Sequence, residues 1–124
     1  MPQEYLELVD ALKALTQPSG VTSEPDRVLP VAEDEWKTRP DADSYGIVSL
    51  DFEVDALQGD NRKTATAYEG AVDLFSLSRT GGGWVEKIKE TLTEHCDGAW
   101  RINHHAYERE TRLFHWEFVF QVEE

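Results

Sequence analysis

The sequence predicts an α+β fold: a mostly antiparallel sheet of two hairpins plus an edge strand, with two helices packed on one face. Two segments repeat apolar residues with the helical period, and two pairs of segments alternate apolar and polar residues with the strand period. This order of elements favours helices that cover one face of an antiparallel sheet. The 124 residues, 40% of them hydrophobic, fit a single domain spanning residues 1–124 with its own core.

The first helix is expected over residues 2–17, and Pro18 ends it. Its apolar stripe follows the i, i+3, i+4, i+7 spacing and consists of Tyr5, Leu8, Val9, Leu12 and Leu15. Residues 27–32 then look extended, and Pro30 favours an edge position because proline has no N–H to donate within a sheet. The acidic stretch 33–44 has few apolar residues and is expected to be a loop.

Residues 45–57 alternate strictly, which predicts a strand with one buried and one acidic face. A turn at 58–61 leads into a second strand over 64–77, so the two segments form a long antiparallel hairpin. Each strand of this hairpin has an acidic face. If the two acidic faces coincide, one side of the hairpin carries five carboxylates: Asp51, Glu53, Asp55, Glu69 and Asp73. A solvated sheet face is the default interpretation, and a wall that repels phosphate is the functional alternative.

Residues 78–83, rich in glycine, break the second strand, and residues 84–96 predict a second helix whose apolar stripe ends at Cys96. That position favours a structural rather than a catalytic cysteine. The last element is a second hairpin, with strands over 99–108 and 112–124 around a three-residue turn.

Three of the four histidines lie in this last hairpin. Its final strand has a large apolar face, which we expect to face the core: Phe114, Trp116, Phe118, Phe120 and Val122. His115 then points away from the core. A three-residue turn would place His105 opposite His115 and Asn103 opposite Glu117, with His104 on the core side. The candidate metal ligands are a set of two histidines and one carboxylate: His105, His115 and Glu117. We favour surface or interface residues instead, and expect no metal, no cofactor and no catalytic residue.

The net charge is −13, from 25 acidic and 12 basic residues. Nucleic acids and anionic membranes are bound by clustered Lys and Arg, so we expect neither specific nucleic-acid binding nor membrane binding. No run approaches the roughly 20 apolar residues of a membrane-spanning helix, and no signal-peptide pattern opens the chain. The single cysteine excludes an internal disulfide and favours a cytosolic setting.

The order of six segments along the chain carries a resemblance to a known family. These segments are Tyr5–Leu15, RVLP at Arg27–Pro30, SYGIVSLDFEV at Ser44–Val54, YEGAVDLF at Tyr68–Phe75, WVEKIKETL at Trp84–Leu92 and LFHWEFVFQVE at Leu113–Glu123. This layout resembles the tail terminator (tail completion, minor tail) proteins of long-tailed bacteriophages and prophages. Those small α+β proteins resemble one another by architecture more than by sequence.

The resemblance implies a non-enzymatic virion assembly protein. Such proteins cap the growing tail tube, usually as a hexameric ring, and help to join the tail to the head. The implied partners are therefore further copies of the chain, the tail tube and head–tail connector proteins. The implied location is the tail–head junction of the virion, after assembly in the host cytoplasm. DNA passes through the ring, and an acidic lumen would not adhere to it.

Ring contacts are expected at the turn of the first hairpin, formed by Gln58, Gly59, Asp60 and Asn61. Two other functions stay open. The chain could be an acidic adaptor or inhibitor that binds a basic partner, or a small metal- or ligand-binding protein that uses the histidine and glutamate cluster. The adaptor would associate with its partner in a salt-sensitive way.

Overall fold

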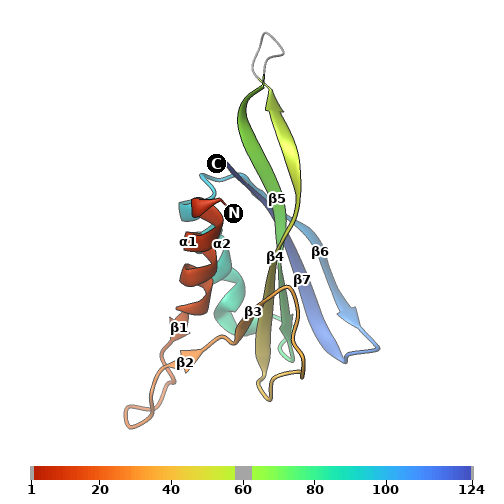
Figure 1. Ribbon diagram of the computed structural model, residues 1–124. Helices are drawn as coiled ribbons and strands as arrows, with labels where there is room; N and C mark the ends of the chain where they lie inside the picture. Colours follow the sequence, from red (N-terminus) through yellow and green to blue (C-terminus); the bar gives the residue numbers. More distant parts are fainter. Residues whose placement is uncertain (1, 58–62, 124) are drawn as a thin grey trace.

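The structure is a computed structural model that describes residues 2–57 and 63–123, with side chains described for 2–51 and 67–123. It is an α+β fold, as predicted, with two helices on one side of a five-stranded sheet (Figure 1). The elements in chain order are α1 Gln3–Lys13, β1 Thr16–Gln17, β2 Arg27–Val28, β3 Val31–Glu33, β4 Ser44–Leu57, β5 Lys63–Ser76, the 3-10 turn η1 Gly81–Gly83, α2 Trp84–His95, β6 Trp100–Glu108 and β7 Leu113–Glu123.

The main sheet has the strand order β3-β4-β5-β7-β6. The two predicted hairpins, β4–β5 and β6–β7, are present and antiparallel, and β5 also pairs antiparallel with β7. The edge strand β3 runs parallel to β4, so the sheet is mixed. The predicted extended segment 27–32 is divided, because β2 pairs with β1 in a separate two-stranded sheet. Leu29, between the two short strands, is buried in the core.

The first helix ends at Lys13 instead of residue 17. Thr16 and Gln17 leave the helix because they pair with Val28 and Arg27 in the small sheet. Gln17 is also held by side-chain hydrogen bonds, since its amide nitrogen donates to the carbonyl of Gly82 at 2.9 Å. The small sheet is therefore tied to the glycine turn that precedes α2.

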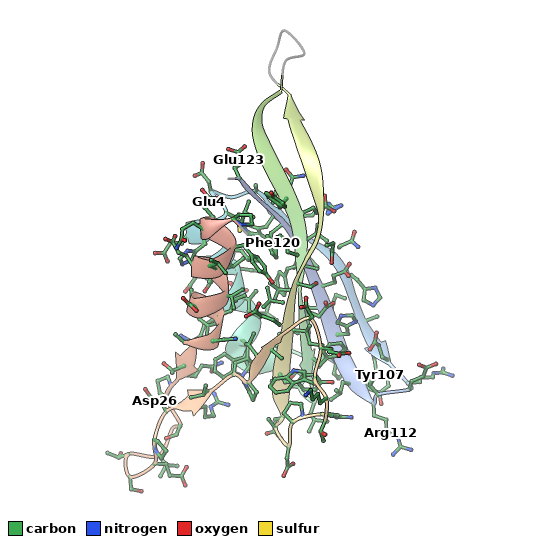
Figure 2. All side chains as sticks on the ribbon, in the orientation of Figure 1. Glu4, Asp26, Tyr107, Arg112, Phe120 and Glu123 are labelled. Carbon is green, nitrogen blue, oxygen red and sulfur yellow. The ribbon has the colours of Figure 1, made fainter. Side chains whose placement is uncertain are left out.

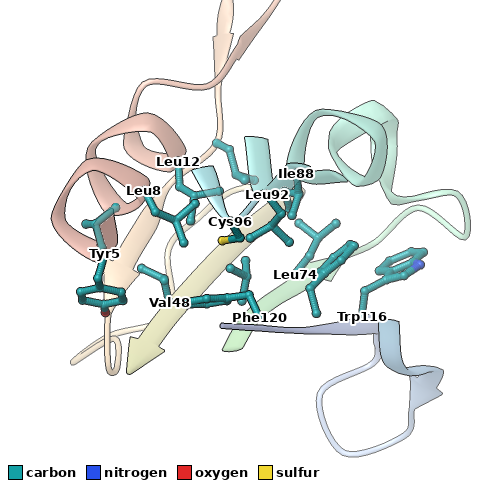
Figure 3. Close-up of a cluster of buried hydrophobic side chains, with 14 of the residues drawn as sticks. Tyr5, Leu8, Leu12, Val48, Leu74, Ile88, Leu92, Cys96, Trp116 and Phe120 are labelled. Atoms are coloured by element: carbon teal, nitrogen blue, oxygen red, sulfur yellow. The ribbon is translucent and has the colours of Figure 1, made fainter. Parts of the chain in front are cut away.

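The core lies between the two helices and the sheet, as Figure 3 shows. The predicted stripes of both helices are buried there, apart from Leu15, which is partly buried. Cys96 belongs to this core, and burial raises the pKa of its thiol to about 12. A thiol with that pKa is neutral at physiological pH, which agrees with the structural role predicted for it.

Three register shifts interrupt the alternation of the long strands. One lies in β4 at Asp51, between the pairs Leu50–Gly70 and Phe52–Glu69. A second lies farther along the same hairpin, between the pairs Ala56–Ala65 and Leu57–Lys63. The third lies in β6 at Asn103, just after Ile102. Each shift adds one residue to one strand, as in a β-bulge. Because side chains alternate along a strand, such an insertion exchanges the two faces for every residue beyond it.

Candidate functional site

The helix-free face of the sheet carries a row of ring side chains in register across the strands. Tyr45 of β4 is opposite Phe75 of β5, which is opposite His115 of β7, which is opposite Ala106 of β6. The Tyr45 and Phe75 rings stack with centroids 5.1 Å apart, and the Phe75 and His115 rings stack at 4.3 Å. This stacking covers the imidazole, whose side chain is only 14% exposed.

Both ring nitrogens of His115 contact carboxylates. Nε2 lies 2.6 Å from Oδ1 of Asp73, and Nδ1 lies 2.9 Å from Oε2 of Glu108. Burial of the imidazole lowers its pKa, but hydrogen bonds to Asp73 and Glu108 and the charges of these carboxylates outweigh burial. The net result is that the pKa of His115 is raised above its usual 6.5.

His104 completes the cluster from the neighbouring strand. Its ring meets that of His115 edge to face, with centroids 5.3 Å apart. One ligand-capable atom each of His104, Glu108 and His115 lies within 4.8 Å of the other two. We call these three residues together with Asp73 the histidine cluster. It has the donor types of a transition-metal site, two imidazoles and carboxylates.

The predicted pairing of His105 with His115 is wrong. The turn between β6 and β7 spans the four residues Arg109–Arg112, with Arg112 at a left-handed φ of 59°. The extra turn residue shifts the register by one, so His105 faces Trp116 and stacks on it at 4.4 Å. His104, predicted on the core side, instead lies exposed on the helix-free face.

The bulge at Asn103 then restores the predicted register. Trp100 and Ile102 therefore pair with Phe120 and Phe118, as the face assignment requires. The predicted pairing of Asn103 with Glu117 is wrong, because Glu117 is opposite His104. The amide of Asn103 nevertheless donates a hydrogen bond to Glu117 Oε1 at 2.7 Å. Glu117 thus has a partner outside the histidine cluster.

The acidic residues predicted along the β4–β5 hairpin do not share one environment in the structure. Asp51 is exposed at the bulge of β4, while Asp73 is part of the histidine cluster. Glu69, half-buried, shares its face of β5 with Asp73. The register pairs Glu53 with Tyr68 and Asp55 with Thr66, and the side chains of Glu53 and Asp55 lie outside the described part of the chain. The contact residues Gln58, Gly59, Asp60 and Asn61 also lie outside the described residues. Ring contacts at this turn and an acidic lumen stay predictions.

Sequence reasoning missed Glu108 and Asp73 as neighbours of His115. One signal was available, because His104, Ala106 and Glu108 occupy alternate positions and so share one face of β6. The small Ala106 opposite His115 leaves room for the two longer side chains to converge. The four-residue turn and the bulge carried no comparable signal.

No protein-family model matches the chain, and a comparison with curated proteins finds no match either. Within the described residues, neither helix has the length and apolar character that crossing a membrane requires.

Proposed function

We propose that this chain is a phage assembly protein of the tail-terminator type, which forms a ring, usually of six subunits in that family, caps the tail tube and helps to join tail to head. The observation that carries the proposal is the outer part of the β4–β5 hairpin. β7 pairs with β5 only over Ala67–Ser76, so in the described sheet Lys63–Thr66 has β4 as its one neighbour. Figure 1 shows this part of the hairpin extending past the helices and the other strands.

A two-stranded ribbon in water is only marginally stable by itself. A hairpin that projects without a third strand or a covering helix is therefore suited to contact another molecule. A second copy of the same chain offers a matching surface, because β6 forms a nine-residue edge with which no described strand pairs on its outer side. The opposite edge, β3, has only three residues.

If the hairpin of one copy contacts the β6 side of the next, each contact pairs two different surfaces of the chain. Such head-to-tail contacts close into a ring when the rotation between neighbours permits it. The charge of −13 per chain gives such a ring an acidic surface toward DNA. It also predicts that moderate salt promotes assembly, because salt screens repulsion between acidic subunits.

The test is sedimentation velocity over a range of protein concentrations and salt concentrations, with two trimmed variants. In the first variant, an Asn-Gly turn replaces residues 55–66 and joins the opposed pair Val54 and Ala67. In the control, the same turn replaces residues 18–26 and joins the opposed pair Gln17 and Arg27. Both variants lose one projecting segment, and neither loses a pair between β5 and β7.

Wild-type protein and the control are expected to form a multi-subunit species that grows with concentration and with salt, and the hairpin variant is expected to stay monomeric. Assembly of the hairpin variant to the same extent as the control would exclude the hairpin as the contact. A wild-type monomer under every condition would contradict ring assembly by the chain itself.

The same charge favours a second candidate, an acidic adaptor or inhibitor that binds a basic partner. Salt separates the two candidates because it acts in opposite directions. Association with a cationic protein weakens as salt rises, whereas self-assembly of acidic subunits strengthens. A chain that stays monomeric and binds lysozyme-like basic proteins only at low salt would favour the adaptor.

A further inference from the structure

We propose that His104, Glu108 and His115 bind one divalent transition-metal ion of the zinc class. Two imidazole nitrogens and one carboxylate oxygen are a common ligand set for such ions, and this set leaves at least one coordination position open for water or for a side chain of another molecule. The proposal concerns the helix-free face near the β6–β7 turn and does not depend on ring assembly.

The backbone brings the three ligands together from two strands. His104 and Glu108 flank Ala106 on one face of β6, and Ala106 lies directly opposite His115. The two flanking side chains therefore approach the imidazole diagonally from either side, over a residue too small to separate them. Diagonal neighbours in antiparallel strands lie about 7–8 Å apart at the backbone, within reach of long side chains.

The distances suit a metal after small side-chain movements. The ligand atoms of a tetrahedral zinc site lie about 3.3 Å apart, because each bond to zinc is about 2.0 Å long. Nδ1 of His115 and Oε2 of Glu108 are now 2.9 Å apart, and the three candidate ligand atoms lie within 4.8 Å of one another. The candidate ligand atoms therefore exceed the separation in a zinc site by about 1.5 Å at most.

Asp73 and Phe75 orient the central ligand. Asp73 Oδ1 lies 2.6 Å from Nε2 of His115 and can accept the Nε2 proton of a histidine that binds a metal through Nδ1. Nδ1 is then the nitrogen that faces Glu108 and the metal position. Phe75 stacks on the imidazole at an interplanar angle of 12° and fixes its plane. A carboxylate behind a ligating histidine is the usual outer partner in zinc sites.

The experiment is calorimetric titration of chelator-stripped protein with zinc chloride. Wild-type protein is expected to bind one Zn²⁺ per chain. The first variant is His104→Ala, because His104 is exposed and its loss leaves the core intact. The matched control is His105→Ala, which removes the adjacent histidine on the opposite face of β6.

His104→Ala is expected to weaken zinc binding by at least about tenfold, and Asp73→Asn by about 10–100-fold without removing a ligand. His105→Ala should bind as wild type does. Absence of saturable binding at one ion per chain would overturn the proposal. An equal loss in His104→Ala and His105→Ala would overturn it too, because zinc would then be bound by exposed histidines without regard to the cluster.

Discussion

The two faces of the main sheet use the same strands for different purposes. The face toward α1 and α2 is closed by apolar side chains, with Phe118 and Phe120 fully buried. The face without helices has an aromatic row whose last ring, His115, is bonded to two carboxylates. Figure 2 shows side chains on both sides of the strands, from Phe120 near the helices to Tyr107 and Arg112 at the β6–β7 turn. The apolar side chains of the helix-covered face stabilise the fold. The helix-free face has the polar groups that are able to bind a ligand.

The helix-covered face could be predicted from the sequence because many positions repeat the same apolar alternation. Every second residue of β7 from Trp116 to Val122 is apolar and buried, so a local error in register changes little. The helix-free face depends on single residues. One additional turn residue at Arg112 and one bulge at Asn103 decide whether His104 or His105 meets His115, and neither departs from common strand composition.

The fold class and the helix stripes followed from the sequence, while the parallel pairing of β3 with β4 did not. A segment of three residues, Val31–Glu33, carries no pattern that tells a parallel from an antiparallel neighbour. The partner of Asp73 could not be predicted from the sequence either. Asp73 was predicted as one of five solvated acids, but the partner that decides its role, His115, is 42 residues away in the chain.

The largest loss of stability is expected on the helix-covered face. Phe120→Ala should lower the free energy of unfolding by about 3–5 kcal/mol, because it removes a fully buried ring and leaves a cavity between α1 and the sheet. Urea unfolding followed by tryptophan fluorescence measures the loss. Phe75→Ala, on the other face, is the comparison, and a loss as large as that of Phe120→Ala would refute the division of roles between the faces.

A smaller loss is expected where the same ring approaches the backbone. Gly70 lies opposite Phe120, and a Cβ added there would collide with the carbonyl oxygen of Ser49 and lie 2.6 Å from Phe120 Cζ. Gly70→Ala should therefore cost about 1–3 kcal/mol. Thermal unfolding measures it. Gly46→Ala is the control, because a Cβ there meets its nearest neighbours only at 3.5 Å. Equal melting temperatures for the two variants would show that Phe120 does not press on Gly70.

On the helix-free face, Asp73→Asn is expected to cost about 1 kcal/mol in metal-free protein. It weakens a charge-assisted hydrogen bond that is partly open to water, since the Asp73 side chain is 21% exposed. Glu117→Gln is the matched control, because Glu117 lies on the same face but bonds to Asn103. Chemical unfolding of both variants at pH 6 compares them. The prediction fails if Glu117→Gln is the more costly change.

The smallest effect is a dependence of stability on pH in metal-free protein. The pKa of His115 is raised in the folded state, so its protonation favours folding. This contribution is fully present below the unfolded value of 6.5 and is lost as the pH rises through the higher folded value. The groups that face the imidazole are Asp73 on β5, His104 and Glu108 on β6, and Glu117 on its own strand.

Denaturant unfolding of wild type and His115→Gln between pH 5.5 and 8.5 isolates this contribution. The advantage of wild type over the variant should be largest at the acidic end and should shrink toward the alkaline end. An advantage that grows with pH would mean that the folded protein prefers a neutral imidazole, which would contradict the two-carboxylate environment.

We propose that the hairpin of one copy and the β6 side of the next join copies of this chain into a ring. Electron microscopy of the concentrated protein at moderate salt, with class averages, would show the ring itself. We expect closed rings in which the hairpin of each subunit lies against the next subunit. Class averages that show only single subunits, or twofold dimers joined through another surface, would contradict this proposal.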